Sequence, residues 1–572
     1  MFGSNNHQAG GPMRSAVGRV HTCGRCQNHG FRVALRNHAQ VCPFALCSCH
    51  KCTCLLEYRA TINQRRKLAE SSRRLEPWAD PWNPALRPFL NPLQNANVSC
   101  EVTYPQRSRL DASGRLEVQK ANWTEEECSY RCIEMPDDNT FDFRPWTRMV
   151  EEKSRFFAQP NCDVFDLRCE VDNQTTFKWL HSQVVERSDR LNEVKTRKTD
   201  TELPDVHILV LDSVSMDHVL RALRKTVHYV RSIMGGVEIA HLNKVGMNSR
   251  PNAYAFLLGE RAEDLPANPW WPAMDGGRLD ELCNKQIKDE NFIGFDFQRA
   301  GYRTMINEDF AATVFHERDC AGFGTRPADH YFRAHAARIS FTPATEDPDY
   351  ARILFKQSCQ ERQDPILHHL RDFIHKYPHT PKFSLSWITM LAHNDANSLY
   401  HADGELANFF RENDEKFANS FVFLMADHGP TFGPLRRSKA GRVEANNPFL
   451  FVTLPRHLRD HSDLVQQIYE NSQQLTTQFD VYASLLELAE VNTRYPMELY
   501  EYANPAGGSN RFFKLVFMAK PSGGIHEAYA EMDEKKNIRF VVEKFPRLTV
   551  FHFHSSCIPP GFLQNYCHCK HV

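Results

Sequence analysis

The sequence has no run of about 18 apolar residues, so it offers no candidate for a membrane-spanning helix. Its first twenty residues contain no apolar stretch of signal-peptide type, and we therefore expect no secretory leader there. Acidic residues are scarce between residues 18 and 74, which contain eleven Lys and Arg but only two acids. The whole chain has a net charge of −1, so the remainder is acidic. A cationic segment on an acidic remainder predicts a module that binds a polyanion. With 41% hydrophobic and 24% charged residues, the chain is neither wholly disordered nor collagen-like.

Seven of the 18 cysteines lie between Cys23 and Cys54 and alternate with histidines. They form Cys-x2-Cys, His-x3-Cys and Cys-x-Cys-x2-Cys steps, in which a loop or helical turn can place two ligands on one zinc ion. Only Cys54 is left over. A disulfide knot is the alternative, but it has no need of histidines, so the pattern favours two tetrahedral Zn²⁺ sites. The eight predicted ligands are Cys23, Cys26, His29, His38, Cys42, Cys47, Cys49 and Cys52.

This segment resembles the doublesex-type DM DNA-binding domain, through Cys23-Gly-Arg-Cys-Gln-Asn-His-Gly30, Leu35-Arg-Asn-His38 and Cys47-Ser-Cys-His-Lys-Cys52. The resemblance implies a nuclear, zinc-dependent regulator of transcription in sex differentiation that binds double-stranded DNA as a homodimer. It also implies two intertwined zinc sites, one of Cys23, Cys26, His38 and Cys42 and the other of His29, Cys47, Cys49 and Cys52.

In the DM family the segment after the zinc core is the helix that contacts the DNA groove. Here that helix would present Arg59, Arg65, Arg66, Lys67, Arg73 and Arg74. A solvated run of charge is the alternative. One departure from the family concerns Ala39 and Gln40, which stand where basic residues are usual, so we expect fewer phosphate contacts and a shallower salt dependence.

Composition divides the chain into a zinc module at 18–74, a proline-rich linker at 75–99, a cysteine-containing part at 100–203 and a large domain at 204–572. Five cysteines lie in the 70 residues from Cys100 to Cys169, and the three N-x-S/T sequons are at Asn97, Asn122 and Asn173. Together they indicate an oxidising, glycosylating compartment for the region from about residue 100. That expectation conflicts with a zinc module in the nucleus.

Residues 204–572 alternate strand-like and helix-like runs, which predicts an α/β fold with a mainly parallel sheet. The apolar run Val206–Leu211 ends at Asp212, Phe421–Ala426 ends at Asp427 and His428, and Phe383–Leu391 is followed by His393. Open α/β sheets build their sites at the carboxyl ends of parallel strands. Two carboxylates and a histidine can hold a divalent cation, which would activate the hydroxyl of Ser249 toward phosphorus or sulfur.

This region resembles the "domain of unknown function 229" branch of the alkaline-phosphatase/sulfatase-like superfamily. The matching stretches include Leu211-Asp-Ser-Val-Ser215, Lys244-Val-Gly-Met-Asn-Ser249, Glu308-Asp309, Ala426-Asp-His-Gly429 and Gly441-Arg-Val-Glu444. The resemblance implies an alkaline-phosphatase-like domain, behind a small zinc-organised, α-rich DM module. It also implies a hydrolase of anionic esters that uses Zn²⁺, Mg²⁺ or Ca²⁺.

The resemblance assigns Asp212, Asp427 and His428 to one metal and the nucleophile to Ser249. His393 becomes a second-metal ligand or the acid that protonates the leaving group. Thr389 stands where the two-metal relatives carry an Asp ligand. Either Glu444 substitutes for that ligand, or the site holds a single metal. Ala253 replaces the Arg of the sulfatase motif, which argues against formylglycine. We expect a clamp for the anionic ester from Arg250, Arg436, Arg437 and Arg442.

Three hypotheses follow. The first is a sequence-specific DNA-binding protein with a phosphatase-like body, and the second is a secreted or lumenal phosphoester or sulfoester hydrolase. The third is that two neighbouring coding units have been joined and are not made as one polypeptide. Within the body, a degenerate domain that only binds is the rival of an active enzyme.

Overall fold

The computed structural model describes most of the chain from Asp80 to residue 489 and parts of the region beyond. The described residues are His29, Cys42, 80–93, 100–121, 125–187, 203–263, 279–288, 291–316, 320–340, 349–489, 498–502, 511–519, 524–532 and 538–540. The chain divides into two compact units, Met1–Asp80 and Pro81–Val572, and the elements below belong to the second. Of the helices in these ranges, none is both long and apolar enough to cross a bilayer.

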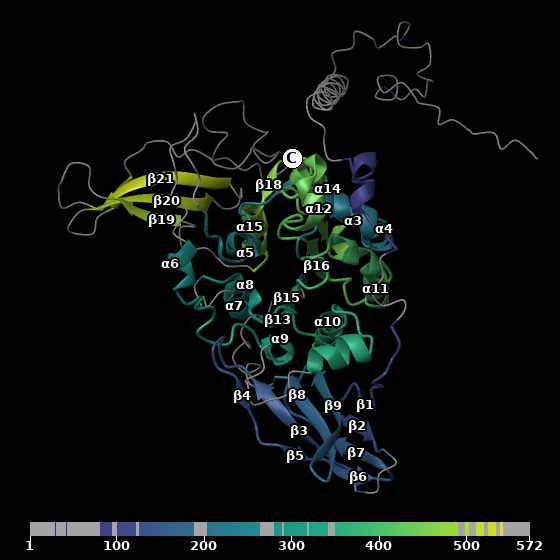
Figure 1. Cartoon of the computed structure of the whole chain (residues 1–572). Coiled ribbons are helices and arrows are strands. Elements are labelled where there is room, and N and C mark those ends of the chain that lie inside the picture. The colour runs from purple at the N-terminus through teal and green to yellow at the C-terminus, as the bar shows by residue number, and fades with distance from the viewer. Residues whose placement is uncertain are drawn as a thin grey trace, which may run out of the picture. The chain divides into compact units, whose positions relative to one another are not determined.

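A seven-stranded sheet forms the centre of the second unit (Figure 1). Five of its strands are parallel, and the two at one edge are antiparallel to their neighbours. The mainly parallel sheet that the sequence predicts is therefore confirmed. In order across the sheet, the strands are β11 (Val237–Glu238), β17 (Leu450–Thr453), β16 (Ser420–Met425), β10 (Asp205–Leu211), β15 (Lys382–Ile388), β13 (Arg303–Glu308) and β14 (His330–Tyr331).

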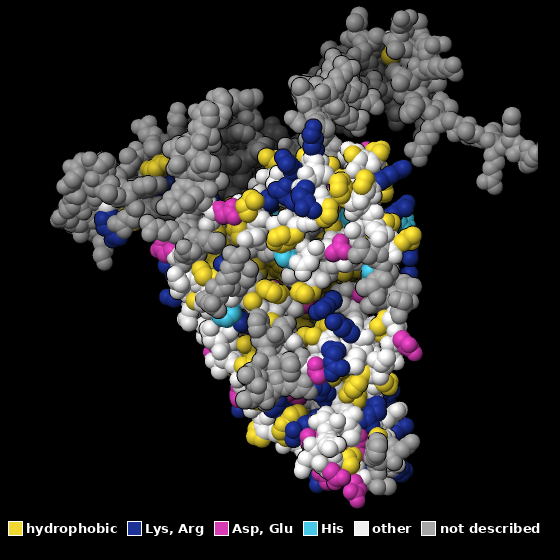
Figure 2. Space-filling model, in the orientation of Figure 1, with side chains coloured by type: hydrophobic (Ala, Val, Ile, Leu, Met, Phe, Trp, Pro, Cys, Tyr) yellow, Lys and Arg dark blue, Asp and Glu magenta, His cyan; other side chains and the backbone are white. Residues whose placement is uncertain are grey.

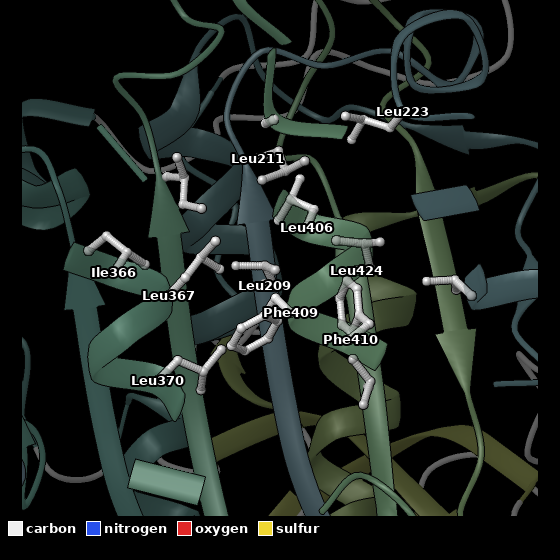
Figure 3. Packing of buried hydrophobic residues seen from close by; sticks show 14 of the residues in the cluster. Leu209, Leu211, Leu223, Ile366, Leu367, Leu370, Leu406, Phe409, Phe410 and Leu424 are labelled. Carbon is white, nitrogen blue, oxygen red and sulfur yellow. The ribbon is translucent and has the colours of Figure 1, made fainter. Parts of the chain in front are cut away.

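The central strand β10 is buried along its whole length because both faces of the sheet are covered. Successive side chains of a strand point to opposite faces. Leu209 and Leu211 pack on one side, among the leucines and phenylalanines of α10 (Asp364–Lys376) and α11 (Leu399–Glu412) (Figure 3). Val206, Ile208 and Val210 pack on the other. This two-sided burial explains why the strand reads as a continuous apolar run.

Each face has its own set of helices. The first is covered by α3 (Met216–Ala222), α4 (Arg224–Ser232), α10 and α11. The second is covered by α5 (Ser249–Ala253), the π-helical turn η2 (Tyr254–Leu258), α7 (Ile293–Arg299), α8 (Thr313–His316) and α15 (Gln478–Leu488). The other elements of the body are α6 (Leu279–Cys283), α9 (Arg333–Ser340), η4 (Arg352–Gln357), η5 (Ala396–Ser398), α12 (Gly433–Arg437), α13 (Lys439–Glu444), η6 (Arg456–Leu458), α14 (Ser462–Asn471) and the paired strands β12 (Leu242–Asn243) and β18 (Thr476–Thr477).

Residues 100–187 form antiparallel sheets that pack their core against α9 and η4. One sheet has the order β1 (Ser108–Leu110), β2 (Leu116–Gln119), β7 (Arg155–Ala158), β6 (Val150–Glu152). The other has the order β4 (Asp142–Phe143), β3 (Glu127–Glu134), β8 (Val164–Val171), β9 (Gln174–Ser182), and β5 (Thr147–Arg148) also pairs with β3. Four disulfides are present among the described cysteines, namely Cys100–Cys359, Cys128–Cys169, Cys132–Cys162 and Cys283–Cys320.

Two further segments flank the body. A four-stranded antiparallel sheet follows it, made of β19 (Glu498–Tyr502), β20 (Arg511–Ala519), β21 (Gly524–Met532) and β22 (Ile538–Phe540). Before it, the 3₁₀ helix η1 (Pro84–Phe89) lies within the segment expected to be a linker. Leu86 is buried there, and the backbone N–H of Asn91 donates to Asn397 at 2.7 Å, so this part of the segment packs on the second unit.

Candidate metal and active site

Two strand ends bring the predicted metal ligands together. Asp212 follows β10, and Asp427 and His428 follow the adjacent parallel strand β16. One ligand atom from each lies within 4.8 Å of the others, and all three side chains are buried. The hydroxyl of Ser249, on a segment far away in sequence, lies 3.2 Å from Asp212 Oδ2 and 3.3 Å from His428 Nε2. The structure thus brings these four predicted residues to one place.

The hydrogen bonds around this group leave one of its metal-binding atoms, Asp427 Oδ2, without a donor among the described residues. His428 Nδ1 lies 2.8 Å from the carbonyl oxygen of Gly429, which can only accept, so we assign the ring proton to Nδ1 and a lone pair to Nε2. Asp427 Oδ1 accepts from two backbone N–H groups, those of Ser213 and His428. Its Oδ2 is buried and has no hydrogen-bond partner among the described residues. A cation would satisfy the buried Asp427 Oδ2 and could share the Nε2 lone pair of His428, which here lies 3.3 Å from the hydroxyl of Ser249.

The electrostatics of the group favour the same ligand. Burial raises the pKa of Asp212 to about 6, and the charge of Asp427 adds to the rise, while the charges of His428 and His393 oppose it. Two carboxylates this close repel each other in a low-dielectric site. A divalent cation would convert the repulsion into attraction, so the donor set fits a metal.

A buried asparagine holds the loop that presents Ser249. Asn252 accepts from the backbone N–H groups of Val245 and Gly246 at 2.9 and 3.3 Å, and it donates to the carbonyls of Gly246 and Asn248 at 3.1 and 2.7 Å. Ser249 then begins α5, which continues directly into η2, and π-helical turns occur mostly at functional sites. Sequence reasoning gave Asn252 no role, because its partners become apparent only when the loop is folded.

Gly429 completes the turn after His428, and its missing side chain is a requirement of packing. A Cβ at this position would lie 2.0 Å from the carbonyl oxygen of Glu444 and 2.8 Å from the Cα of Ala445. Both are backbone atoms, which cannot swing aside as a side chain would. The Asp-His-Gly sequence therefore combines two ligands with a residue that allows α13 to pass close behind them.

His393 and Glu444 do not join the ligand group. His393 lies beyond the end of β15, where its ring contacts the exposed ring of Phe432 with centroids 5.2 Å apart. Glu444 is buried in an ion pair with Arg221 at 2.6 Å and accepts the hydroxyl of Ser215 at 2.7 Å. Its carboxylate compensates the buried guanidinium of Arg221, and its interpretation as a substitute ligand stays a prediction.

Sequence reasoning missed a role for Asp309, the first residue after β13. Its carboxylate accepts from the backbone N–H groups of Thr389 and Met390 at 2.7 and 3.0 Å. A carboxylate from the neighbouring strand thus lies beside Thr389. Burial raises the pKa of Asp309 to about 7, and the charge of Asp212 adds to the rise. Its place directly after a buried strand was the signal in the sequence.

The charge of one ligand acts on a basic side chain. Burial lowers the pKa of Lys244, the charge of Arg436 lowers it further, and the charges of Glu263 and Asp427 oppose this. Lys and Arg side chains gather on the surface in the part of the view where Figure 1 draws α12 (Figure 2). Of the four predicted clamp residues, Arg437 and Arg442 are exposed, Arg436 is half-buried and Arg250 is buried.

The predicted zinc module is hardly described. Of its eight ligands the structure describes only His29 and Cys42, and Cys42 is buried. The other six ligands lie outside the described residues, as do the predicted DNA contacts Arg59, Arg65, Arg66, Lys67, Arg73 and Arg74.

Family comparison places the site in a defined group. Residues 90–505, most of the chain, match the family described as "Protein of unknown function (DUF229)". The chain belongs to the DUF229 family. All the candidate site residues, from Asp212 to His428, lie inside this DUF229 region. A second family, described as "DM DNA binding domain", matches residues 19–66, so both resemblances seen in the sequence are confirmed.

The curated relatives match the DM segment. Doublesex- and mab-3-related transcription factor C2 of Mus musculus is 48% identical over 49 residues, which is 9% of this chain and 13% of that protein. Doublesex- and mab-3-related transcription factor dmd-3 of Caenorhabditis elegans is 39% identical over 59 residues, or 10% of this chain and 23% of that protein. The chain thus spans less than a quarter of the length of either relative.

The solved structures that are similar match the DUF229 region. One is a protein in the alkaline phosphatase superfamily from Vibrio parahaemolyticus, with 12% identity, a TM-score of 0.33 and coverage of 60% of this chain and 83% of that one. Another is the lipoteichoic acid synthase LtaP from Listeria monocytogenes, with 10% identity, a TM-score of 0.33 and coverage of 59% and 87%.

Proposed function

We propose that the DUF229 region is a metal-dependent hydrolase of anionic phosphate or sulfate esters. The observation that carries this proposal is the meeting of Asp212, Asp427 and His428 around one point, with the hydroxyl of Ser249 at their edge. When bound there, a divalent cation (Zn²⁺, Mg²⁺ or Ca²⁺) would supply Lewis acidity that makes the hydroxyl a stronger nucleophile. The alternative, a domain that only binds, offers no reason for a hydroxyl at this place.

The remaining groups fit the roles that ester hydrolysis needs. Lys244 and Arg436 hold the anionic ester. Ser249 Oγ gives its proton to solvent water and forms a bond to phosphorus or sulfur as the ester P–O or S–O bond breaks. His393, at the exposed rim, donates a proton to the departing alcohol oxygen. Water then hydrolyses the seryl ester and releases inorganic phosphate or sulfate.

Turnover of an aryl phosphate, an aryl phosphodiester and an aryl sulfate with added Zn²⁺, Mg²⁺ or Ca²⁺ tests the proposal. We expect hydrolysis of at least one ester to fall by a factor of 100 or more in Ser249→Ala and Asp427→Asn. The matched control is Ser484→Ala, whose hydroxyl bonds only a carbonyl of its own helix, 2.9 Å away. Equal inertness of wild type and both site variants with every metal would show that the domain is a binding relic.

We also propose that residues 18–74 bind duplex DNA as a zinc-dependent transcription regulator, and that this module acts in the nucleus. The match to the DM DNA binding domain and the eleven basic residues support this second function. Two structural Zn²⁺ held by the eight predicted ligands would fold the module. The proposal also includes a homodimer and DNA contacts made by the basic segment from Arg59 to Arg74.

A gel-shift titration measures this function. We expect duplex DNA to be bound with a steep fall of log affinity against log salt, and we expect a chelator or Cys23→Ser to abolish binding. Substituting Cys54, the cysteine left over, is the matched control and should leave binding intact. Absence of any shift with two equivalents of zinc bound would contradict the proposal.

A further inference from the structure

A large polar cleft lies between α10 and the sheet that contains β1 and β2, inside the second unit. Its volume is about 1130 Å³, slightly above the usual range of about 300–1,000 Å³ for small-ligand sites. In Figure 1, β9, β1 and β2 are drawn directly below α10. None of the residues that line this cleft belongs to the candidate metal site, so it is a separate feature with no assigned role.

One wall of the cleft is a basic face of α10. His368, Arg371 and His375 line it at helical spacings of three and four residues, which place them on one side of the helix, and the neighbouring Lys376 also lines it. The first three of these side chains are exposed and the fourth is half-buried. Asp372, 3.6 Å from Arg371, is the one carboxylate that α10 contributes to the lining. This wall is therefore cationic.

The opposite wall is balanced and polar. Arg107 pairs with Glu126 at 2.9 Å, and Arg109 and Arg155 share Glu117. Amide side chains of Gln106 and Gln119 also line the cleft, and amides both donate and accept hydrogen bonds. Over the whole lining, five Lys and Arg side chains meet three carboxylates, an excess of two positive charges before any histidine is protonated.

A buried histidine borders the cleft. His335 is 4% exposed and stacks on Phe332 with ring centroids 4.4 Å apart. Within the described part of the chain, neither ring nitrogen has a hydrogen-bond partner. Burial lowers its pKa to about 3, so the ring is neutral and carries one donor and one acceptor. A hydroxyl group, which also donates and accepts, is the natural partner of such a ring.

We propose that this cleft binds an acidic oligosaccharide. The sugar hydroxyls would meet His335 and the amides, and the anionic groups would meet Arg371 and Lys376 on α10. A nucleic-acid strand fits less well, because the aromatic residue of the lining, Trp179, is only 3% exposed and gives bases no face on which to stack.

Hydrogen–deuterium exchange on the full chain, loaded with zinc, tests the proposal with a readout for each segment. The probe is a sulfated heparin hexasaccharide, compared with neutral maltohexaose and a single-stranded oligonucleotide. We expect the heparin probe to protect peptides from 364–376 and 106–119 and the neutral sugar to give at least tenfold weaker protection. Peptides from 18–74 report separately on polyanion binding by the DM module, so the two effects remain distinct.

Charge reversal supplies the matched comparison. Arg371→Glu with Lys376→Glu is expected to weaken the protection of 364–376 at least tenfold, while Arg411→Glu with Lys416→Glu, an equal change on exposed residues elsewhere, should leave it unchanged. Any of four results would overturn the proposal: protection confined to 18–74, equal loss of protection in both double variants, equal binding of maltohexaose, or stronger protection by the oligonucleotide. The assay needs no turnover, so Ser249→Ala should bind as wild type whether or not the proposed hydrolysis is correct.

Discussion

Replacing Asp427 by asparagine should stabilise the metal-free protein although it removes a metal ligand. The carboxylates of Asp212 and Asp427 lie no more than 4.8 Å apart, and Asp427 Oδ2 has no partner among the described residues. At this separation an effective dielectric constant near 20 gives a repulsion of about 3 kcal/mol. Asparagine keeps the Oδ1 that accepts from Ser213 and His428, and its new N–H₂ group can donate to Asp212 or to the lone pair of His428.

The dependence on pH follows from the pKa of Asp212, which is raised to about 6 in the folded state. Between pH 4 and pH 6 the folded protein takes up this proton more readily than the unfolded chain, so this group's contribution to stability falls as pH rises through that window. Above pH 6 both carboxylates are charged and the asparagine variant gains most. We therefore expect about 3 kcal/mol of added stability at pH 8 with chelator, shrinking toward pH 5.

Urea unfolding followed by tryptophan fluorescence is the assay, because seven of the eight tryptophans lie in the second unit. With a divalent cation at 100 times its dissociation constant, wild type should gain about 2.7 kcal/mol and the variant much less. Asp205→Asn is the matched control: Asp205 pairs with buried Lys382 at 2.9 Å, so its loss should destabilise at pH 8 with or without metal. Lower stability of metal-free Asp427→Asn at pH 8 would refute the reasoning.

Three further predictions concern packing and covalent structure. Gly429→Ala should lower stability by about 1–3 kcal/mol and weaken metal binding in calorimetry, since the new Cβ would meet backbone atoms. The control Gly404→Ala lies in a helix and its Cβ would have nothing within 4 Å, so it should stabilise the protein by up to about 1 kcal/mol. Glu444→Gln leaves the guanidinium of Arg221 buried without its counter-charge and should cost about 3–5 kcal/mol in urea unfolding; a loss below 1 kcal/mol would contradict the pairing. Replacing the disulfide-bonded pair Cys132 and Cys162 by alanines should destabilise the second unit by about 2–5 kcal/mol. Dithiothreitol should likewise lower the unfolding midpoint of wild type, and an unchanged midpoint would exclude a stabilising disulfide.

The parallel strands of the body were predictable because burial on both faces makes each a continuous apolar run. The predicted run Val206–Leu211 lies within β10, and the runs ending at Leu391 and Ala426 overlap β15 and β16. Their polar followers could be expected at one edge, since carboxyl ends of parallel strands meet there. The strand order, with β10 between β15 and β16, needed the structure, because no local pattern encodes which strands are neighbours.

The parts that could not be predicted depend on contacts between distant segments. Arg221 and Glu444 are 223 residues apart and neither has a local signal of its partner, so their ion pair could not be predicted from the sequence. Lys244 reads as an ordinary basic residue until folding lets the charges of Arg436 and Asp427 act on it. The disulfide partners were open for the same reason, since cysteine spacing leaves many pairings.

The two parts of the chain favour different compartments, and a glycan at Asn173 decides between them for the body. Zinc thiolates need a reducing environment, whereas the second unit contains four disulfides among its described cysteines. Asn173 lies exposed in the tight turn between β8 and β9 with a φ of 63°, where a glycosylating enzyme can reach it. A body made in the secretory pathway should therefore carry a glycan there.

Apparent mass with and without glycosidase, read with antibodies to each part, measures this in cells. We expect a glycosidase-sensitive species recognised by the body antibody and not by the DM antibody, and a loss of mass in Asn173→Gln and in Thr175→Ala. Asp172→Asn is the matched control, because it leaves the Asn-Gln-Thr sequon intact. One unglycosylated species near 66.2 kDa, seen by both antibodies, would refute separate products. The zinc ligands and the cysteines that are paired in the structure would then share one reducing compartment.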